Sequence, residues 1–378
     1  METKWISLTD WLKETSDKKQ ALEKQTQELK QHPGIKEAAR ILREGGLVAF
    51  PTETVYGLGA DGLNTEAAAR IYEAKGRPSD NPLILHIARM EDLSGIVREI
   101  PKIALRLAER FWPGPLTMIF PKAACVPEGT TGGLNTVAVR MPKHPLALAL
   151  IEAAGTPVAA PSANLSGRPS TTTAAHVRED MEGRIDCIVD GGAVGVGLES
   201  TIVDVTGEKP MMLRPGYITK EMLEEVVGEV LLDPVIMAAQ PEPNLKPKAP
   251  GMKYRHYAPK AEMFLCEGSS QAVVSYINQE AKKKRQEGKR LGVLATEQTR
   301  EAYQADVVLS VGSRESEESI ARHLFEVLRK FDEAEVDVIY SECFGEGALG
   351  MAIMNRLRKA AGYRVVQVEE AAVVGSEK

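Results

Sequence analysis

Five basic residues in the N-terminal two thirds of the chain could bind a phosphate or a carboxylate. Arginine suits forked contacts with these anions, and lysine supplies a mobile point charge. Each lies in or beside a motif at an expected strand or helix end, and they are Lys75, Arg77, Arg140, Arg168 and Arg214. The chain contains no Walker A phosphate loop. A bound nucleotide would therefore be held by side-chain charge rather than by a glycine-rich cradle.

Two apolar segments end in dense polar sets. Leu47–Phe50 is followed by proline, two threonines, a glutamate, a tyrosine and two glycines, all within Gly46–Ala60. This set either lines a cleft or satisfies the local backbone groups of a turn. Ser162 and Asn164 follow the apolar run 157–160, where they could bind phosphate oxygens or the water shell of a metal ion. The alternative for this pair is a simple Asx or ST turn.

Composition narrows the functional classes. The six histidines are isolated, and His86 lies in an apolar run, where a lone histidine is usually a satisfied core residue. The four cysteines form no CxxC pair, so we expect no zinc site and no disulfide framework. The net charge of −6 argues against general adhesion to nucleic acid. With no long apolar run and no signal-peptide core, we expect a cytoplasmic protein without membrane association.

The pattern of apolar runs and prolines predicts two α/β domains. We expect an N-terminal extension at 1–34, a first domain at 35–231, a proline-rich linker at 232–260 and a second domain at 261–378. The first domain should contain a mixed sheet flanked by helices, and the second a smaller, parallel, Rossmann-like sheet.

These expectations assign short apolar runs to strands and longer amphipathic segments to helices. The strands expected in the first domain are 47–50, 83–88, 116–120, 137–141, 158–160, 187–189 and 201–205. A helix over 66–74 should be capped by Asn64 or Thr65 and should stop at Gly76. This stop places Lys75 and Arg77 at the end of a helix.

The second half of the linker is basic and aromatic. Its residues 246–260 include four lysines and one arginine in combination with Tyr254, His256 and Tyr257, and they include no acidic residue. Such a segment is either a solvated basic linker or a flap that closes over an anion, with Gly251 as a pivot.

A glycine pattern in the second domain formally matches a dinucleotide-binding fingerprint. Gly345–Gly350 reads GxGxxG between an expected strand and helix, with Glu369 about twenty residues further on. It opens the last unit of a small domain, which leaves no second nucleotide-binding half. We therefore favour a tight glycine turn over a NAD site.

Several motifs, taken together and in order, resemble those of the YrdC-like threonylcarbamoyl-AMP synthases. They are Gly46–Ala60, Lys75–Leu83, Phe111–Thr117, Thr136–Pro142, Ala160–Gly167 and Leu198–Ile202. The resemblance extends from about Ala38 to Gly216, and the long C-terminal part is similar to the two-domain form of the family. Relatives often have alanine and an acidic residue where this chain has Gly132 and Asn135.

The resemblance implies a YrdC-like fold and a nucleotidyltransferase activity. The implied reaction joins L-threonine, bicarbonate or CO2, and ATP, with Mg²⁺, to give threonylcarbamoyl-adenylate and pyrophosphate. The adenylate would serve the threonylcarbamoyl modification of a tRNA adenosine. The implied partners are therefore downstream tRNA threonylcarbamoyl-transfer proteins, with a weak contact to tRNA itself.

The resemblance also assigns residues. The threonine site would comprise Thr54, His86, Arg140, the Ala160 backbone and Ser200. The ATP site would comprise Arg77, Asn81, Thr136, Ser162, Ser170, Arg214 and Tyr254. The catalytic set would be Lys75, Arg77, Ser162 and Asn164, with no metal ligand supplied directly by the protein. In the family a tyrosine-containing linker lies near the nucleotide, which favours the flap.

Three other functions remain as alternatives. A YrdC-like fold could act as a double-stranded RNA or tRNA-binding module without catalysis, although the acidic overall charge opposes tight binding. Carbamoyl transfer in hydrogenase maturation would need partner domains with zinc-type cysteine spacing, which this chain lacks. A NAD-dependent enzyme built on the second domain is the third alternative.

Overall fold

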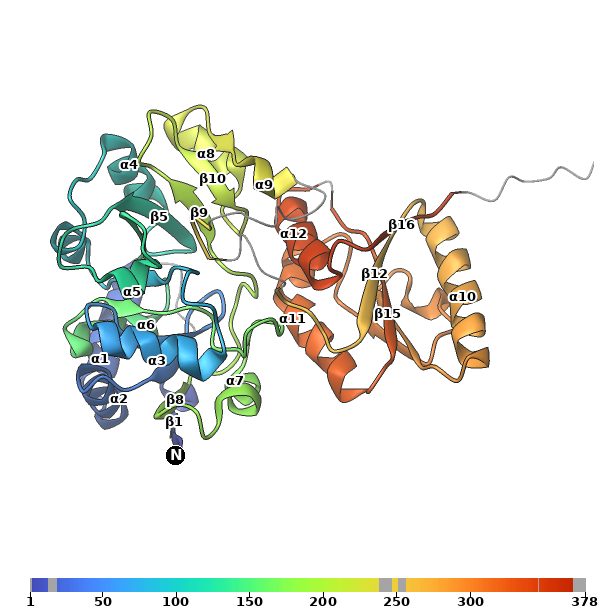
Figure 1. The fold of residues 1–378 in the computed structure, drawn as a ribbon, viewed down its shortest axis with the longest axis horizontal. Helices are drawn as coiled ribbons and strands as arrows, with labels where there is room; N and C mark the ends of the chain where they lie inside the picture. Colours follow the sequence, from blue (N-terminus) through green and yellow to red (C-terminus); the bar gives the residue numbers. More distant parts are fainter. Residues whose placement is uncertain (1, 13–18, 238–246, 251–255, 346, 370–378) are drawn as a thin grey trace, which may run out of the picture. The chain divides into compact units, whose positions relative to one another are not determined.

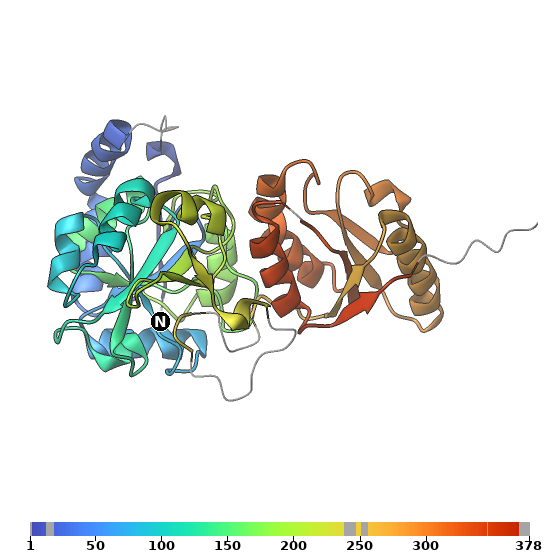
Figure 2. The same cartoon turned by 90° about the horizontal axis from the view of Figure 1, so that it is seen from above.

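The computed structural model describes residues 2–12, 19–237, 247–250, 256–345 and 347–369 of the chain. The chain forms two compact units (Figures 1 and 2). The first contains Met1–Ser166 and Ser170–Tyr254, and the second contains Gly167–Pro169 and Arg255–Lys378. The short segment Gly167–Pro169, which begins at the last residue of the Ala160–Gly167 motif, therefore groups with the second unit.

The first unit is built on a mixed sheet, as predicted. Within the described residues the sheet has 11 strands in the order β1-β8-β2-β3-β7-β4-β6-β5-β9-β10-β11. The strands are β1 (Lys4–Ser7), β2 (Val48–Pro51), β3 (Tyr56–Asp61), β4 (Ile84–His86), β5 (Leu116–Pro121), β6 (Thr136–Arg140), β7 (Val158–Ala159), β8 (Cys187–Asp190), β9 (Thr201–Asp204), β10 (Met211–Arg214) and β11 (Leu231–Leu232). Parallel pairs such as β4–β6 and β5–β9 alternate with antiparallel pairs such as β5–β6 and β9–β10.

Helices and short 3-10 turns surround this sheet. They are α1 (Lys19–Lys30), α2 (Pro33–Arg43), α3 (Thr65–Lys75), α4 (Lys102–Phe111), α5 (Glu128–Thr131), α6 (Pro145–Ala154), α7 (Ala174–Met181), α8 (Lys220–Val227) and α9 (Pro234–Met237), with η1 (Thr9–Trp11) and η2 (Met90–Gly95). The six residues of β5 are all buried, which explains their continuous apolar character. One core cluster joins α2 and α6 to the sheet through Ile35, Leu42, Leu146, Leu150, Val48 and Phe50.

The first thirty residues contribute an edge strand that the sequence does not predict. β1 pairs in parallel with β8, so that Lys4 lies opposite Cys187 and Ser7 opposite Asp190. Leu8 and Leu29 are fully or almost fully buried and belong to the same core cluster as Phe50. The N-terminal segment is therefore part of the first unit's sheet and core.

Helix α3 begins and ends as the sequence predicts. The Asn64 side chain accepts hydrogen bonds from the backbone N–H groups of Glu66 and Ala67, so Asn64 is the N-cap. Gly76 ends the helix in the left-handed conformation with φ of 60°, which glycine adopts without a steric penalty. This turn fixes Lys75 as the last helical residue, with Arg77 just beyond it.

The second unit is a parallel sheet with helices, as predicted. Its described strands lie in the order β14-β13-β15-β12-β16, and every pair in it is parallel. The elements are β12 (Glu262–Glu267), α10 (Ser270–Gln286), β13 (Leu291–Ala295), η3 (Arg300–Ala302), β14 (Val307–Ser310), α11 (Glu317–Glu333), β15 (Val338–Glu342), α12 (Gly350–Ala360) and β16 (Val365–Gln367).

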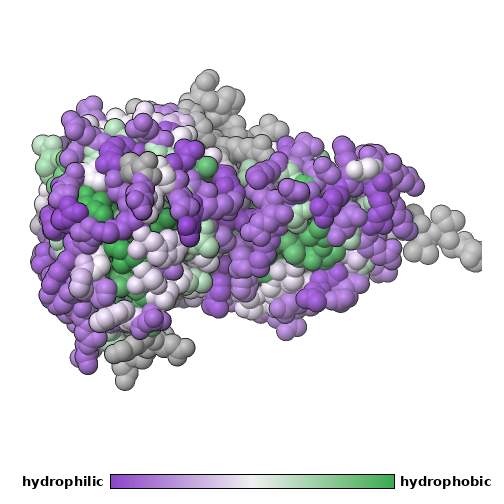
Figure 3. All heavy atoms as spheres, turned by 90° about the horizontal axis from the view of Figure 1, so that it is seen from below, coloured by the Kyte–Doolittle hydropathy of each residue, from purple (hydrophilic) through white to green (hydrophobic). Residues whose placement is uncertain are grey.

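The surface of both units is mostly hydrophilic on the face shown in Figure 3, with scattered apolar areas. The exposed large apolar side chains of the described residues are Trp5, Trp11, Leu63, Leu105 and Val365. No helix in the described ranges is both long enough and apolar enough to span a membrane.

Candidate active site

Arg140 lies at the centre of a buried polar cluster in the first unit. It is the last residue of β6, and its side chain is only 5 % exposed. Its guanidinium donates from Nη1 to Thr54 Oγ1 at 2.9 Å and from Nε to the Gly114 carbonyl at 3.3 Å. Its Nη2 lies 2.7 Å from Glu53 Oε1 in an ion pair. The structure therefore brings together two residues of the predicted threonine site, Thr54 and Arg140.

His86 lies directly beside Arg140 in the sheet. The two residues are opposite each other in the parallel β4–β6 pair. The imidazole is buried, with Nδ1 3.2 Å from the Ile84 carbonyl oxygen. Burial, and secondarily the positive charge of Arg140, lower the pKa of His86 to about 3. His86 is consequently neutral at neutral pH and can take part in a binding site only through hydrogen bonds and packing.

This low pKa predicts a pH-dependent stability. An unfolded histidine has a pKa near 6.5, so below that pH the unfolded chain binds a proton that folded His86 does not. The free energy of unfolding should therefore fall as the pH falls, by about 1.4 kcal/mol per pH unit from this residue. Between pH 7 and pH 5 the expected loss is about 2 kcal/mol.

Denaturant unfolding at pH 7 and pH 5 measures this effect. The three tryptophans, Trp5, Trp11 and Trp112, all lie in the first unit, so tryptophan fluorescence reports on that unit. A His86→Asn variant removes the titrating group and should be less sensitive to pH by the amount stated. An unchanged pH dependence in the variant would contradict the buried, neutral state of His86.

Ser200 and Arg214 connect the predicted threonine and ATP residues. Arg214, at the end of β10, donates from Nη2 to the Ser200 carbonyl at 2.9 Å and to Ser200 Oγ at 3.2 Å. Ser200 Oγ also lies 2.7 Å from Thr117 Oγ1, a pair of hydroxyls in which either can donate. Both Ser200 and Arg214 are buried. One residue assigned to threonine and one assigned to ATP are therefore in direct contact.

Lys75, Ser162 and Asn164 form a second network. The buried Lys75 ammonium donates to the backbone carbonyls of Ser162 and Asn164. Ser162 Oγ donates to Asn164 Oδ1, and the Asn164 amide donates to the Leu165 carbonyl at 2.7 Å. Lys75 thus ties the end of α3 to the loop that follows β7. Three of the four residues that the resemblance assigns to the catalytic set are therefore brought together by the fold.

The remaining predicted ATP residues are spread over three places. Arg77 Nη2 donates to the Asn81 and Pro82 carbonyls, so it closes the turn that contains Asn81. Ser170 Oγ donates to Glu199 Oε1, beside Ser200 in sequence. Thr136 begins β6, at the opposite end of that strand from Arg140.

The last three predicted residues, Ala160, Tyr254 and Arg168, lie in different parts of the chain. Ala160 follows β7, and its N–H donates to the Ile84 carbonyl at 2.9 Å, two residues from His86. Tyr254, like the pivot Gly251, lies outside the described residues. Arg168 groups with the second unit, where its Nη2 is 3.7 Å from Asp332 Oδ2.

Residues 247–250 of the linker pack into the first unit. Ala249 is fully buried in a cluster with Ile84, Ile119, Ala138, Ile202 and Leu213. The carbonyl of the next residue, Pro250, accepts a hydrogen bond from Arg214 Nη1 at 3.3 Å. The linker therefore reaches the same arginine that the sequence assigns to ATP.

This packing predicts that a charge at Ala249 weakens ligand binding at the predicted ATP site. Ala249→Asp places a carboxylate in an apolar cluster, where an unpaired charge is strongly unfavourable. The segment should detach from Arg214, and we expect the KM for ATP to rise at least about tenfold. Lys248→Asp is the matched control because Lys248 is exposed, and it should change the KM little. Equal KM values in both variants would contradict a role for this segment.

Glu53, Thr117 and Glu199 join the candidate site through their contacts, although the sequence did not single them out. Each contacts a residue that was predicted: Arg140, Ser200 and Ser170 respectively. Glu53 and Glu199 were visible as acidic residues inside the quoted motifs, yet nothing in the sequence shows which cation or hydroxyl they would meet. Among the described residues, no group of His, Cys, Asp and Glu could hold a metal ion.

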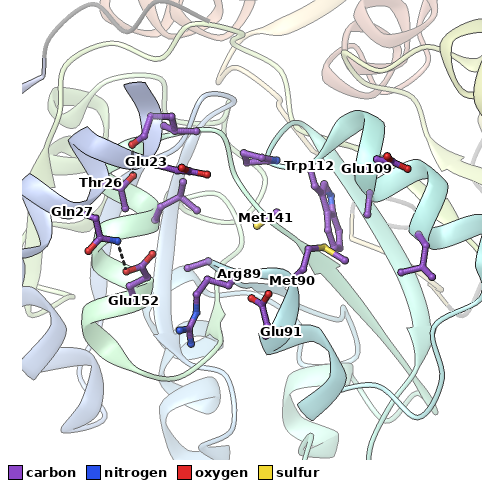
Figure 4. Close-up of a pocket in the computed structure, with 16 residues that line it drawn as sticks. Glu23, Thr26, Gln27, Arg89, Met90, Glu91, Glu109, Trp112, Met141 and Glu152 are labelled. Carbon is purple, nitrogen blue, oxygen red and sulfur yellow. Dashed lines mark hydrogen bonds between the residues drawn. The ribbon is translucent and has the colours of Figure 1, made fainter. Parts of the chain in front are cut away.

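A separate hollow of about 480 Å³ is lined in part by Met141, the residue that follows β6 (Figure 4). Its walls come from α1, η2, α4 and α6, with Leu22, Arg89, Leu105, Trp112 and Glu152 among the lining residues. None of the predicted site residues lines it. Gln27 donates to Glu152 at 3.1 Å across its edge. This hollow is distinct from the cluster around Arg140.

The glycine turn of the second unit is occupied by a carboxylate of the protein itself. Glu317, in the first turn of α11, accepts hydrogen bonds from the Gly347 N–H at 3.1 Å and from the Leu349 N–H at 2.7 Å. These are the backbone groups that a dinucleotide phosphate would need. The geometry supports the tight glycine turn over a NAD site.

Comparison with known proteins identifies the family of this chain. The Sua5/YciO/YrdC family model, described as "Telomere recombination", matches residues 40–216, and the model "Threonylcarbamoyl-AMP synthase, C-terminal domain" matches residues 218–362. Threonylcarbamoyl-AMP synthase of Pyrococcus abyssi is 52 % identical over 334 residues, covering 88 % of this chain and 96 % of the relative. The Bacillus subtilis enzyme of the same name is 52 % identical over 339 residues, covering 89 % and 95 %.

A solved structure extends the similarity to three dimensions. The crystal structure of P. abyssi Sua5 complexed with L-threonine has a TM-score of 0.85 and 47 % sequence identity. The match covers 98 % of this chain and all of that one. The chain belongs to the threonylcarbamoyl-AMP synthase family, in its two-domain form with a YrdC-like domain followed by a Sua5 C-terminal domain.

Proposed function

We propose that this protein is a nucleotidyltransferase that makes threonylcarbamoyl-AMP from L-threonine, bicarbonate or CO2, and ATP, with release of pyrophosphate. The observation that supports it most is the direct contact between Ser200 and Arg214 beside the Arg140 cluster. A threonine site and a nucleotide site that share a contact could hold the two reactants next to each other. The product would serve threonylcarbamoyl modification of a tRNA adenosine.

The chemistry asks the protein mainly for positioning and charge. The ammonium group of threonine first loses a proton to give the neutral amine. The amine nitrogen then forms a bond to the carbon of CO2 and loses a second proton, or it forms that bond to bicarbonate and water leaves, and either route gives a carbamate. The carbamate oxygen then attacks the α-phosphorus of ATP, the bond to the β-phosphate oxygen breaks, and pyrophosphate leaves with the bonding electrons. Both reactants are anions, so the approach requires nearby positive charge. The buried guanidinium groups of Arg140 and Arg214 would supply part of it.

The Lys75 network would hold the loop that faces the nucleotide. Because the Lys75 ammonium is bound to two carbonyls, it fixes the backbone that carries Ser162 and Asn164. Mg²⁺ is expected to accompany ATP. The described residues offer it no carboxylate cluster, so the phosphates themselves would be its main ligands.

Release of pyrophosphate from ATP tests this function. We expect release only when both L-threonine and bicarbonate are present, and loss of release when either is omitted. A protein that only binds RNA would release no pyrophosphate under any of these conditions. Release that is independent of threonine would also contradict the proposal.

A further inference from the structure

Glu53 is a buried carboxylate that the predicted site does not use. It lies between Thr52 and Thr54, directly after β2, and its side chain is 13 % exposed. Both carboxylate oxygens are inaccessible to solvent, and neither accepts a hydrogen bond from the described residues. Its one ion pair within those residues is with Arg140 Nη2 at 2.7 Å.

The neighbouring polar groups do not satisfy this carboxylate. The Thr52 hydroxyl donates to the Val55 carbonyl at 2.7 Å and shares a contact with the Thr54 hydroxyl at 2.8 Å. His144 precedes α6, and its Nδ1 is buried without a hydrogen-bond partner. Burial lowers the pKa of His144 to about 4 against the opposing charge of Glu53, so His144 is neutral at neutral pH and does not balance that charge.

Apart from its ion pair with Arg140, this carboxylate has no hydrogen-bond donor among the described residues. An ionised carboxylate offers about four acceptor positions, and leaving a buried polar group short of partners is unfavourable. Such a group is retained where a bound molecule supplies the donors. An ammonium group, with its three N–H donors, is well suited to a carboxylate.

The Arg140–Glu53 pair matches the two charged groups of a free amino acid. An α-amino acid carries a carboxylate and an ammonium group on one carbon, and this pair presents a guanidinium and a carboxylate in contact. We propose that Glu53 binds the α-ammonium group of L-threonine while Arg140 binds its carboxylate. In the free protein the two side chains neutralise each other. When threonine binds, its carboxylate replaces Glu53 as the partner of Arg140, and its ammonium group replaces Arg140 as the partner of Glu53. This inference rests on the proposed function, which supplies threonine as the substrate.

The proposal makes the site selective for a zwitterion. A ligand with the carboxylate but without the amine would leave Glu53 buried and short of donors. Hydrogen bonds to charged groups contribute about 1.5–3 kcal/mol, which corresponds to roughly a 10- to 100-fold preference for threonine. (R)-3-Hydroxybutanoate, which is L-threonine with the amine replaced by hydrogen, is the matched probe.

Calorimetric titration of the full-length protein tests the proposal. The wild-type protein should bind L-threonine about 10- to 100-fold more tightly than (R)-3-hydroxybutanoate. In Glu53→Gln this ratio should fall to within about threefold, and the KM for threonine should rise while the KM for ATP stays constant. Glu152→Gln is the control, because it removes a carboxylate of the same unit that pairs with Lys30, and it should keep the wild-type ratio.

Two outcomes would overturn the inference. One is equal affinity of the wild-type protein for both probes, and the other is an unchanged ratio in Glu53→Gln. Should that variant not fold, Glu53→Asp keeps the charge and should keep the preference, and the wild-type comparison decides in any case. If wild-type protein binds threonine and releases pyrophosphate but does not discriminate, only the Glu53 assignment fails. If it neither binds threonine nor releases pyrophosphate, the proposed function fails as well.

Discussion

Replacing Arg140 by alanine is expected to weaken L-threonine binding by roughly 100- to 1,000-fold, while ATP affinity changes by less than about threefold. Arg140 offers a forked contact to a carboxylate, and each charge-assisted hydrogen bond contributes about 1.5–3 kcal/mol. Its Nη1 and Nη2 atoms contact Thr54 and Glu53, whereas Arg214 contacts Ser200 and the Pro250 carbonyl. Arg140 is not among the residues that the resemblance assigns to ATP, so its loss should act mainly on threonine.

Separate titrations with threonine and with a nonhydrolysable ATP analogue measure the two affinities. Arg178→Ala is a suitable control, because this exposed arginine contacts Glu182 and the ring of Trp5 and belongs to none of the predicted site sets. Arg140→Lys keeps a charge for Glu53 but loses the fork, so it should retain the fold and still bind threonine poorly. Equal loss of both ligands in Arg140→Lys would contradict the assignment.

Replacing Lys75 by methionine is expected to lower kcat at least about 100-fold with a smaller effect on the KM for threonine. Methionine fills a similar volume but donates no hydrogen bond, so the Ser162 and Asn164 carbonyls lose the Lys75 ammonium as a donor. Each such loss costs about 1–3 kcal/mol, and the loop should lose its fixed geometry.

Steady-state kinetics and denaturant unfolding together test the Lys75 prediction. The first unit should unfold at a lower denaturant concentration, because buried carbonyl groups are left without the ammonium. Lys209→Met removes an ammonium from an exposed pair with Glu229 and should leave both kcat and stability near wild type. A Lys75→Met protein with full kcat would show that the network does not position the reacting groups.

Apolar runs gave a reliable prediction of the central strands. β2, β5, β6 and β8 appear within one or two residues of their expected positions, because strands buried on both faces are continuous apolar segments. The sequence does not predict β3, because Gly57 and Gly59 are typical of a turn. In the structure Gly59 lies so close to Phe50 and Val158 that a Cβ would be 2.7 and 2.9 Å from their side chains. Only tertiary packing explains a strand at that place.

The sequence singled out the basic side chains of the candidate site but not its acidic ones. Arg140 and Arg214 could be recognised because arginines stand out beside fixed turns. Glu53 could not be assigned, because its partner is 87 positions away in the sequence and on another strand. Arg168 is the converse case: the sequence singled it out because it lies beside a motif, but the structure groups it with the second unit.

The parallel pairing of β1 with β8 has a practical consequence for protein production. Shortened forms that begin near α2 would lack β1. The backbone N–H and C=O groups of β8 that pair with β1 would then have no partner strand. An uncovered apolar border of this kind is a template for association between molecules, so such forms should precipitate or form soluble multimers. Affinity tags are better attached at the far terminus, and limited trimming at the start should stop before Lys4.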